Sequence, residues 1–434
     1  MMETDLSPAV QPTDQNLSAG GPVIHPLETP LATLLAQATA PPQLQVYCGG
    51  LTPRELDAPG KEIAALLAGV AVHDLGWLRR VAVRGEDRLR WLNGMVTNTV
   101  SGLGENAGSW NFVLNAQGRI QGDLHVWRAG DAPLSGLGKS GQDESGTGEA
   151  DLELVIAADQ YEKLLAHLDH FIIMDDVELV PRSLDAEGGL TGETALGLSG
   201  PLSADLLARL GLPALPKPLT SARALWNGLN LRVVRGYGVL TPHYELWVQA
   251  AEIPALWKAL VDPGEAGGAG ATPVGAASLE AFRIAEGIPA YGIDIAERDL
   301  AQETSQMRAL SFDKGCYLGH EIVERIRSRG SVHRHLRPLE LFGPLPAAGT
   351  ELVLENGASA GKITSAAELP LATGARIFAL GMIPREAEFL PRQQGSAAGN
   401  PEVRNQPFTY TAGTVTGSAR ILTAPPALEP GKQS

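Results

Sequence analysis

One cysteine of this chain lies in a setting where a thiol could do chemistry. The segment Lys314-Gly315-Cys316-Tyr317-Leu318-Gly319-His320-Glu321 places Cys316 two residues after Lys314 and between two glycines. From residue 313 to 337 there are six lysines and arginines against three acidic residues, in a chain whose formal net charge is -15. Because nearby positive charge favours the thiolate, Cys316 and Lys314 are candidate catalytic residues.

The apolar spacing after Cys316 predicts a helix from Tyr317 or Leu318 to Arg327. Cys316 would then lie at the helix N-terminus, where backbone N–H groups favour a thiolate. The alternative is that Cys316 is a small core residue and that the arginines form a solvated helix face. The residues alone leave both interpretations open.

A second candidate lies on a predicted strand, 119–127, which follows a hairpin turn. Alternation sends Ile120, Leu124 and Val126 to one face and the polar side chains, Asp123 among them, to the other. If the polar face lines a cavity, Asp123 could hold an amine or ring nitrogen of a ligand. If that face meets solvent, Asp123 is one polar residue of a hairpin.

A third candidate is the helix predicted to begin after Ser278 and to end at Gly287. Arg283 and Glu286 fall on or beside its core-facing stripe, so this charged pair is either a structural ion pair or a ligand clamp. Tyr291 follows at once, and its ring could stack on a planar ligand.

The elements that must position these residues indicate an α+β fold. Strand-like and helical segments alternate irregularly up to about residue 330, and after it short strand candidates are separated by Gly/Pro turns. The second pattern predicts a small antiparallel β-barrel or sandwich. We therefore expect a disordered tail at 1–45, an α+β region at 46–330, a barrel at 331–425 and a tail at 426–434. Low-complexity insertions are expected near 131–150 and 262–272.

Composition limits the class of protein. The pI near 5.1 argues against bulk nucleic-acid binding, and the longest apolar run, 63–72, is about half of a roughly 20-residue membrane span. Two cysteines are too few for a disulfide framework and fit a reducing cytoplasm. The nine histidines show no convincing ligand spacing, so no metal site is expected.

The cysteine segment resembles the K-G-C-Y-x-G-Q-E signature of the YgfZ family of folate-binding proteins, part of the superfamily of the glycine-cleavage T-protein (aminomethyltransferase). Residues 279–294 are similar to that family's L-E-x-x-R-I-E-x-G-I-P…Y-G-x-D-I stretch, and 361–365 resemble the G-x-I-T-S strand of the superfamily's barrel. The resemblance covers roughly residues 75–422. It implies a three-domain cloverleaf, in which two interleaved α+β domains surround a folate pocket and a small antiparallel barrel follows.

The resemblance also implies a function. It predicts binding of tetrahydrofolate or a one-carbon derivative, a role in iron–sulfur cluster assembly or repair with its assembly factors or client enzymes as partners, and through those clients an effect on tRNA modification. Asp123 matches the aspartate near the reactive folate nitrogens, and Arg283 matches an arginine facing the folate. Tyr237 lies in a turn similar to the R-T-G-Y-T-G-E turn of T-protein, and with Tyr291 it is expected to contact the cofactor.

Two departures bear on function. His320 replaces the signature glutamine, and the turn at Tyr237 lacks the T-protein glutamate, which weakens an aminomethyltransferase interpretation. A folate-dependent one-carbon transferase is nevertheless the main alternative. A third possibility is an interaction module that uses the arginines after Cys316 to contact RNA or a protein.

Overall fold

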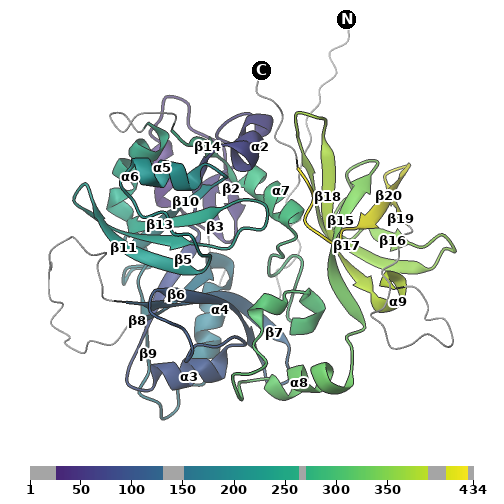
Figure 1. Ribbon diagram of the computed structural model, residues 1–434, viewed down its shortest axis with the longest axis horizontal. Coiled ribbons are helices and arrows are strands. Elements are labelled where there is room, and N and C mark those ends of the chain that lie inside the picture. Colours follow the sequence, from purple (N-terminus) through teal and green to yellow (C-terminus); the bar gives the residue numbers. More distant parts are fainter. Residues whose placement is uncertain (1–25, 131–150, 263–269, 390–406, 429–434) are drawn as a thin grey trace, which may run out of the picture.

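The computed structural model describes residues 26–130, 151–262, 270–389 and 407–428. A large mixed body lies beside a compact C-terminal barrel (Figure 1). The predicted insertion at 131–150, most of the one at 262–272, and the tail from 429 onward lie outside the described residues.

The body is built on one sheet that joins two halves. Its strand order is β14-β4-β10-β13-β12-β11-β6-β7-β8-β5-β9, and β11 meets β6 at a single residue pair, Thr220 with Ala107. The first half consists of β4 (Ala71–Asp74), β10 (Glu193–Ser199), β11 (Thr220–Trp226), β12 (Leu229–Arg235), β13 (His243–Gln249) and β14 (Thr272–Val274). The second half consists of β5 (Leu78–Arg84), β6 (Ala107–Leu114), β7 (Ile120–Ala129), β8 (Asp151–Ala157) and β9 (Glu178–Pro181).

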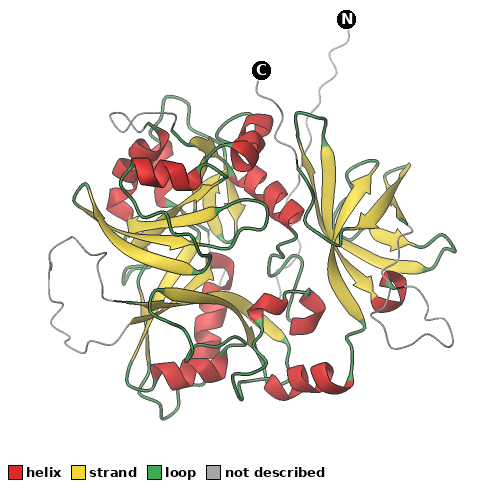
Figure 2. Cartoon of the chain, in the orientation of Figure 1, coloured by secondary structure: helices red, strands yellow, loops and turns green. Residues whose placement is uncertain are grey.

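Each half of the sheet has its own hydrophobic core. Leu196, Leu246 and Leu256 are fully buried in the first core, and Leu92, Leu154 and Leu164 are buried in the second. The helices that pack on these halves are α2 (Pro59–Ala68), α3 (Arg88–Met95), α4 (Ala158–Asp169), α5 (Ser203–Arg209) and α6 (Ile253–Val261), which Figure 2 shows against the strands. The chain visits the first half, crosses to the second and returns, so the two halves are interleaved in sequence.

The expectation of a tail through residue 45 is wrong from Leu27 onward. A small sheet of β1 (Leu27–Glu28), β3 (Gly50–Pro53) and β2 (Leu44–Tyr47) precedes the body, with helix α1 (Pro30–Leu35) between β1 and β2. Thr29 caps α1 and Leu31 is buried in the first core. The Pro- and Ala-rich composition conceals this helix, because six residues are too few to give a periodic signal.

The C-terminal barrel is confirmed. Six antiparallel strands close in the order β15-β18-β17-β16-β19-β20, as Figure 1 shows on the right of the molecule. Their bounds are β15 (Arg334–Phe342), β16 (Glu351–Val353), β17 (Ser359–Leu369), β18 (Arg376–Pro384), β19 (Phe408–Ala412) and β20 (Val415–Ile421), with helix α9 (Arg385–Glu388) after β18. Phe378, Phe408 and Tyr410 are almost fully buried.

Two helices connect the body to the barrel. Helix α7 (Ala276–Glu286) ends at Gly287, whose left-handed backbone (φ 72°) closes the last turn as its position predicted. Helix α8 (His320–Arg329) begins later than predicted, because Gly319 has a left-handed backbone (φ 81°) and forms the N-cap. Among the described residues, no helix is long and apolar enough to cross a membrane.

Candidate functional site

Asp123 lies in a partly buried polar site on β7. Its Oδ2 accepts a hydrogen bond from Trp110 Nε1 (2.8 Å), and its Oδ1 accepts one from Gln160 Nε2 (3.1 Å). Gln160 Oε1 in turn accepts the backbone N–H of Asp123 (2.9 Å). Burial raises the pKa of the Asp123 carboxyl, and the two side-chain hydrogen bonds oppose that rise. Asp123 is therefore a fixed, partly buried acceptor rather than a solvated hairpin residue.

Strand register explains why these groups meet. In the antiparallel pair β6–β7, Phe112 lies opposite Asp123 and Trp110 lies opposite His125, so the Trp110 indole reaches diagonally to the carboxylate. Gln160 comes from the first turn of α4, which packs on β7. The neighbouring Asp159 has its pKa raised to about 6 by burial and by the charge of Asp123.

The second cysteine lies near this acidic pair. The backbone carbonyl of Cys48 accepts a hydrogen bond from the N–H of Asp159 (3.2 Å). Burial raises the pKa of the Cys48 thiol, and the charges of Asp159, Glu280 and Asp123 raise it further. Cys48 is thus held as a neutral thiol beside the carboxylates.

Arg308 is a site residue that sequence reasoning missed. Its guanidinium carbon lies 4.8 Å from the centre of the Trp110 ring and 3.8 Å from that of Tyr237. Burial and the charge of Arg308 lower the pKa of His125 to about 4. Arg308 therefore lies over the same face of β7 that carries Asp123 and His125. It stands in a short 3₁₀ turn, Met307–Ala309, with no periodicity or motif to mark it.

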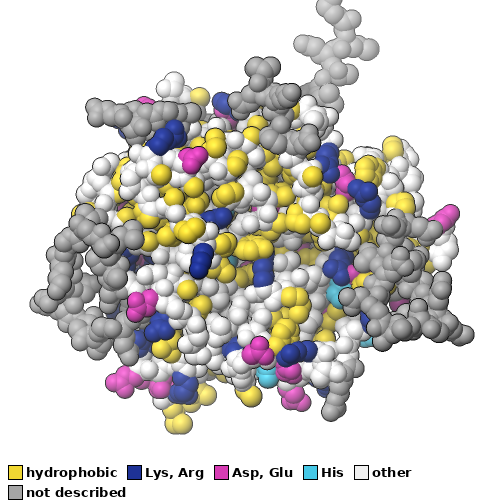
Figure 3. Space-filling view, viewed as in Figure 1, with side chains coloured by type: hydrophobic (Ala, Val, Ile, Leu, Met, Phe, Trp, Pro, Cys, Tyr) yellow, Lys and Arg dark blue, Asp and Glu magenta, His cyan; other side chains and the backbone are white. Residues whose placement is uncertain are grey.

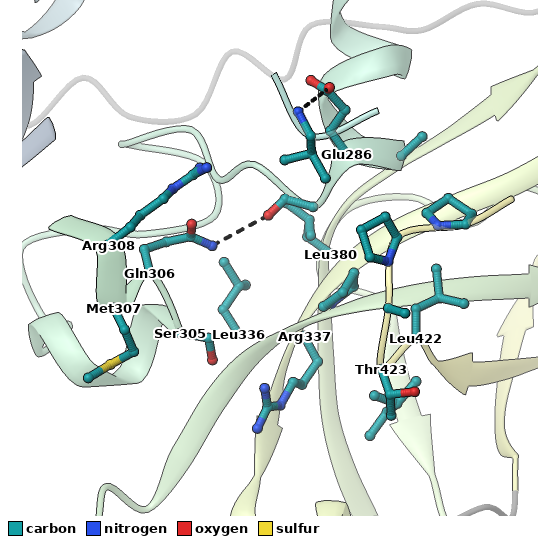
Figure 4. A pocket seen from close by; sticks show the side chains of 18 of the residues that line it. Glu286, Ser305, Gln306, Met307, Arg308, Leu336, Arg337, Leu380, Leu422 and Thr423 are labelled. Atoms are coloured by element: carbon teal, nitrogen blue, oxygen red, sulfur yellow. Dashed lines mark hydrogen bonds between the residues drawn. The ribbon is translucent and has the colours of Figure 1, made fainter. Parts of the chain in front are cut away.

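A cavity of about 610 Å³ opens between the body and the barrel. Tyr237 lines it from the body. Figure 4 shows Glu286 and Arg308, also from the body, and Arg337 and Leu422 from the barrel side. Of the predicted site residues, Tyr237 is in its wall. Asp123 is not one of the lining residues; it accepts a hydrogen bond from Trp110, whose ring contacts Arg308 of the wall.

The predicted pair of Arg283 with Glu286 is wrong. Glu286 Oε1 accepts the backbone N–H groups of Val239 (2.9 Å) and Leu240 (2.8 Å), and so it fixes the turn that follows Tyr237. Burial raises the pKa of Glu286 to about 7. Arg283 and Glu286 are three residues apart on α7 but contact different partners. Their spacing in the sequence does not reveal this.

Arg283 pairs instead with Glu280 and Asp294. Its Nη1 donates to Asp294 Oδ2 (2.7 Å) and to the Ile288 carbonyl (2.6 Å), and its Nε donates to Glu280 Oε2 (2.9 Å). Asp294 Oδ1 also accepts the hydroxyls of Thr364 (2.6 Å) and Ser365 (2.7 Å) on β17. This network joins α7 to the barrel, so the structural-ion-pair interpretation accounts for Arg283.

Tyr291, the other predicted aromatic contact, is bound to Lys163. Its hydroxyl oxygen accepts a hydrogen bond from Lys163 Nζ (2.6 Å), and that ammonium also lies 5.0 Å from the centre of the Tyr291 ring. Burial is the main cause that raises the pKa of Tyr291, and Asp123 contributes to the same rise. The structure thus brings Tyr291 and Asp123 within electrostatic range of each other.

Cys316 is exposed and lies before α8 rather than in its first turn. The helix-dipole argument for its thiolate therefore fails, because that effect is confined to the terminal turn. Lys314 Nζ donates to the carbonyls of Val96 and Asn98, both at 2.6 Å, and burial lowers the pKa of Lys314 to about 7. Lys314 thus anchors this segment to the loop after α3.

Hydrogen bonds of Asn98 link the cysteine segment to the rest of the site. Asn98, whose carbonyl binds Lys314, donates through Nδ2 to the carbonyls of Trp110 (3.2 Å) and Arg308 (2.9 Å). His320 packs against Tyr317 with ring centres 4.8 Å apart, and it lies at the start of α8. Within the ranges that the structure covers, no three His, Cys, Asp or Glu residues are arranged to hold a metal ion.

Comparison with known proteins gives the context for this geometry. No family model matches the chain. It is 27% identical over 358 residues to an aminomethyltransferase of Rubrobacter xylanophilus (78% of this chain, 85% of the relative), and 25% identical over 305 residues to one of Frankia alni (70% and 76%). A chloroplastic protein of Arabidopsis thaliana that carries the name of a transferase is 25% identical over 323 residues, which span 74% of this chain and 66% of that protein.

A solved structure shows the same fold. The glycine cleavage system aminomethyltransferase T from Bartonella henselae superposes with a TM-score of 0.72 at 17% identity, covering 92% of this chain and 97% of the other. The chain therefore has the T-protein-like α+β architecture with a C-terminal barrel. This agreement and the sequence relatives support the T-protein superfamily, and the narrower YgfZ resemblance stays a prediction that rests on the cysteine segment.

Proposed function

We propose that this protein binds tetrahydrofolate or a one-carbon derivative at the site formed by Asp123, Trp110 and Arg308. The observation that carries the proposal is the partly buried carboxylate of Asp123, held by Trp110 and Gln160 on the polar face of β7. The residues fit a folate: an acceptor for a ring or amine N–H, aromatic faces at Trp110 and Tyr237, and a partly buried arginine. Relatives named aminomethyltransferase lend further support.

When bound, the folate would supply the one-carbon chemistry. Asp123 would accept a hydrogen bond from a ligand nitrogen and fix its orientation, and Tyr237 and Tyr291 would border the ring system. Arg283, by contrast, would act at a distance by holding α7 against the barrel. Lys314 would keep the cysteine segment against the Trp110 side of the site.

As the protein's role, we propose support of iron–sulfur cluster assembly or repair and, through client enzymes, of tRNA modification. The exposed thiol of Cys316 on a signature-like segment supports a contact with another protein or a cluster. Two free cysteines suit a reducing compartment, and we propose the cytoplasm.

In a strain that lacks this protein, wild type should restore the activity of iron–sulfur enzymes and Cys316→Ala should not. Full rescue by Cys316→Ala would show that the iron–sulfur role does not require the thiol.

Aminomethyl transfer to folate is the second candidate, and the aminomethyltransferase relatives favour it. The turn after Tyr237 argues against it, because Val239 and Leu240 stand where the T-protein turn continues to glutamate. Tetrahydrofolate-dependent ammonia release from a lipoyl-bound aminomethyl donor would establish this reaction. No release by folded, folate-binding protein would leave the iron–sulfur role as the better account.

A further inference from the structure

Arg308, which is partly buried, differs from three other arginines that the structure describes. Arg80 and Arg232 both pair with Glu153, and Arg283 pairs with Asp294. Within the described ranges, no carboxylate lies within ion-pair distance of Arg308, no group accepts a hydrogen bond from its side chain, and its Nε is buried without a partner. The charge of Glu286 acts on Arg308 without forming an ion pair. A partly buried guanidinium with free N–H donors marks a place where an anion can bind.

The Arg308 side chain is nevertheless held in place. The faces of Trp110 and Tyr237 attract the guanidinium, at 4.8 and 3.8 Å from the ring centres, but they offer no acceptor to its N–H groups. Asn98 Nδ2 fixes the backbone carbonyl of Arg308 (2.9 Å). Rings and backbone thus position the guanidinium and leave its N–H edge for a ligand.

The nearby acidic and basic groups do not compete for this position. Glu286 lines the same cavity, but its Oε1 is occupied by two backbone N–H groups of the turn after Tyr237. Arg337, also in the wall, is paired with Glu388, although its Nε, like that of Arg308, is buried without a partner. Among the described residues that line this wall, Arg308 is therefore the cation that has no carboxylate partner and keeps its guanidinium N–H groups for an incoming anion (Figure 4).

We propose that Arg308 binds a carboxylate of the ligand, and that this carboxylate belongs to the glutamyl tail of a folate. A guanidinium is planar and offers paired N–H donors that match the two oxygens of a carboxylate. In a folate, the p-aminobenzoyl group separates the reactive nitrogens from the glutamate. Asp123 and Arg308 are likewise separated by one aromatic side chain, Trp110, which contacts both. The inference rests on the proposed folate function.

The test is calorimetric titration with two probes. One is 5-formyltetrahydrofolate, and the other is its analogue in which a neutral methylamide replaces the glutamate. The variants are Arg308→Gln, Arg308→Lys and, as a matched control, Arg327→Gln, whose exposed guanidinium lies over the Phe312 ring and outside the cavity wall. Circular dichroism and thermal melting establish that each variant is folded.

Arg308→Gln should lose about 10- to 100-fold in affinity for the glutamate-bearing folate and bind the methylamide analogue as wild type does. Arg308→Lys should lose less, because it keeps the charge but not the paired geometry, and Arg327→Gln should bind both probes normally. An equal loss for both probes, or no loss, would overturn the role of Arg308 while folate binding stands. Failure of wild type to bind either probe would overturn the folate function itself, and this inference with it.

Discussion

At the scale of single residues, the site depends on contacts across strands and loops. Alternation along β7 correctly placed Asp123 on the polar face, because a period of two is visible in the sequence. Its partners Trp110 and Gln160 lie 13 and 37 residues away, and no local pattern connects them. Arg308 was missed for the same reason: its role comes from aromatic rings that the fold brings to it.

Glu286 gives a prediction about pH. Its pKa is about 7 when folded against a usual 4.5, so between those values the unfolded chain has lost a proton that the folded protein keeps. The contribution of Glu286 to the free energy of unfolding therefore falls as pH rises from 4.5 to 7, by up to about 3 kcal/mol. Glu286→Gln keeps an oxygen for the N–H groups of Val239 and Leu240 but cannot titrate.

Urea denaturation at pH 5 and pH 7 measures this effect. The unfolding free energy of Glu286→Gln minus that of wild type should be larger at pH 7 than at pH 5. Using the difference cancels the opposite contribution of His73 and His243, whose pKa values are lowered to about 4 and 3 by burial. A difference that does not change with pH would refute the raised pKa of Glu286.

At the scale of elements, helix starts were harder to predict than helices. The apolar stripe correctly indicated a helix near 318–327, but α8 begins at His320 because Gly319 adopts a left-handed backbone. A Cβ at Gly319 would lie 2.6 Å from the carbonyl oxygen of Asn115 on the β6–β7 turn. That tertiary contact is invisible in the sequence, and it moves Cys316 out of the helix.

Gly319→Ala and Gly315→Ala form a matched pair of variants. They test whether the close approach of Gly319 to Asn115 matters for stability. Both glycines have positive φ, but a Cβ at Gly315 meets nothing within 4 Å. We expect Gly315→Ala to cost about 1 kcal/mol of stability from backbone strain alone, and Gly319→Ala to cost at least about 2 kcal/mol because the clash is added. Chemical denaturation measures both, and equal costs would show that the Asn115 contact is unimportant.

At the scale of the whole molecule, the barrel was predictable and its attachment was not. Short strands between Gly/Pro turns are a local signal, and they placed the boundary near residue 330, four residues before β15 begins at Arg334. Asp294, which joins Arg283 to Thr364 and Ser365, was not selected, because its partners lie on separate parts of the chain. On the face drawn in Figure 3, charges of both signs are interspersed with hydrophobic side chains.

Asp294→Ala should loosen the barrel from the body. It leaves the buried Arg283 without one of its two carboxylate partners, which costs about 3–5 kcal/mol for a buried pair. Differential scanning calorimetry should then show the single transition broadening or splitting into two. The control is Glu351→Ala, which breaks an exposed barrel pair with Lys362 and should cost at most about 1 kcal/mol. Unchanged melting of Asp294→Ala would contradict its joining role.

We propose that Asp123 holds a folate at the polar face of β7, and calorimetric titration with tetrahydrofolate tests this proposal most directly. Wild type should bind one equivalent. Asp123→Asn, which loses the charge and one acceptor at similar size, should bind at least about tenfold more weakly. The matched control Asp169→Asn, at an exposed carboxylate at the end of α4, should bind as wild type does. No binding by wild type, or equal binding by Asp123→Asn, would contradict the account.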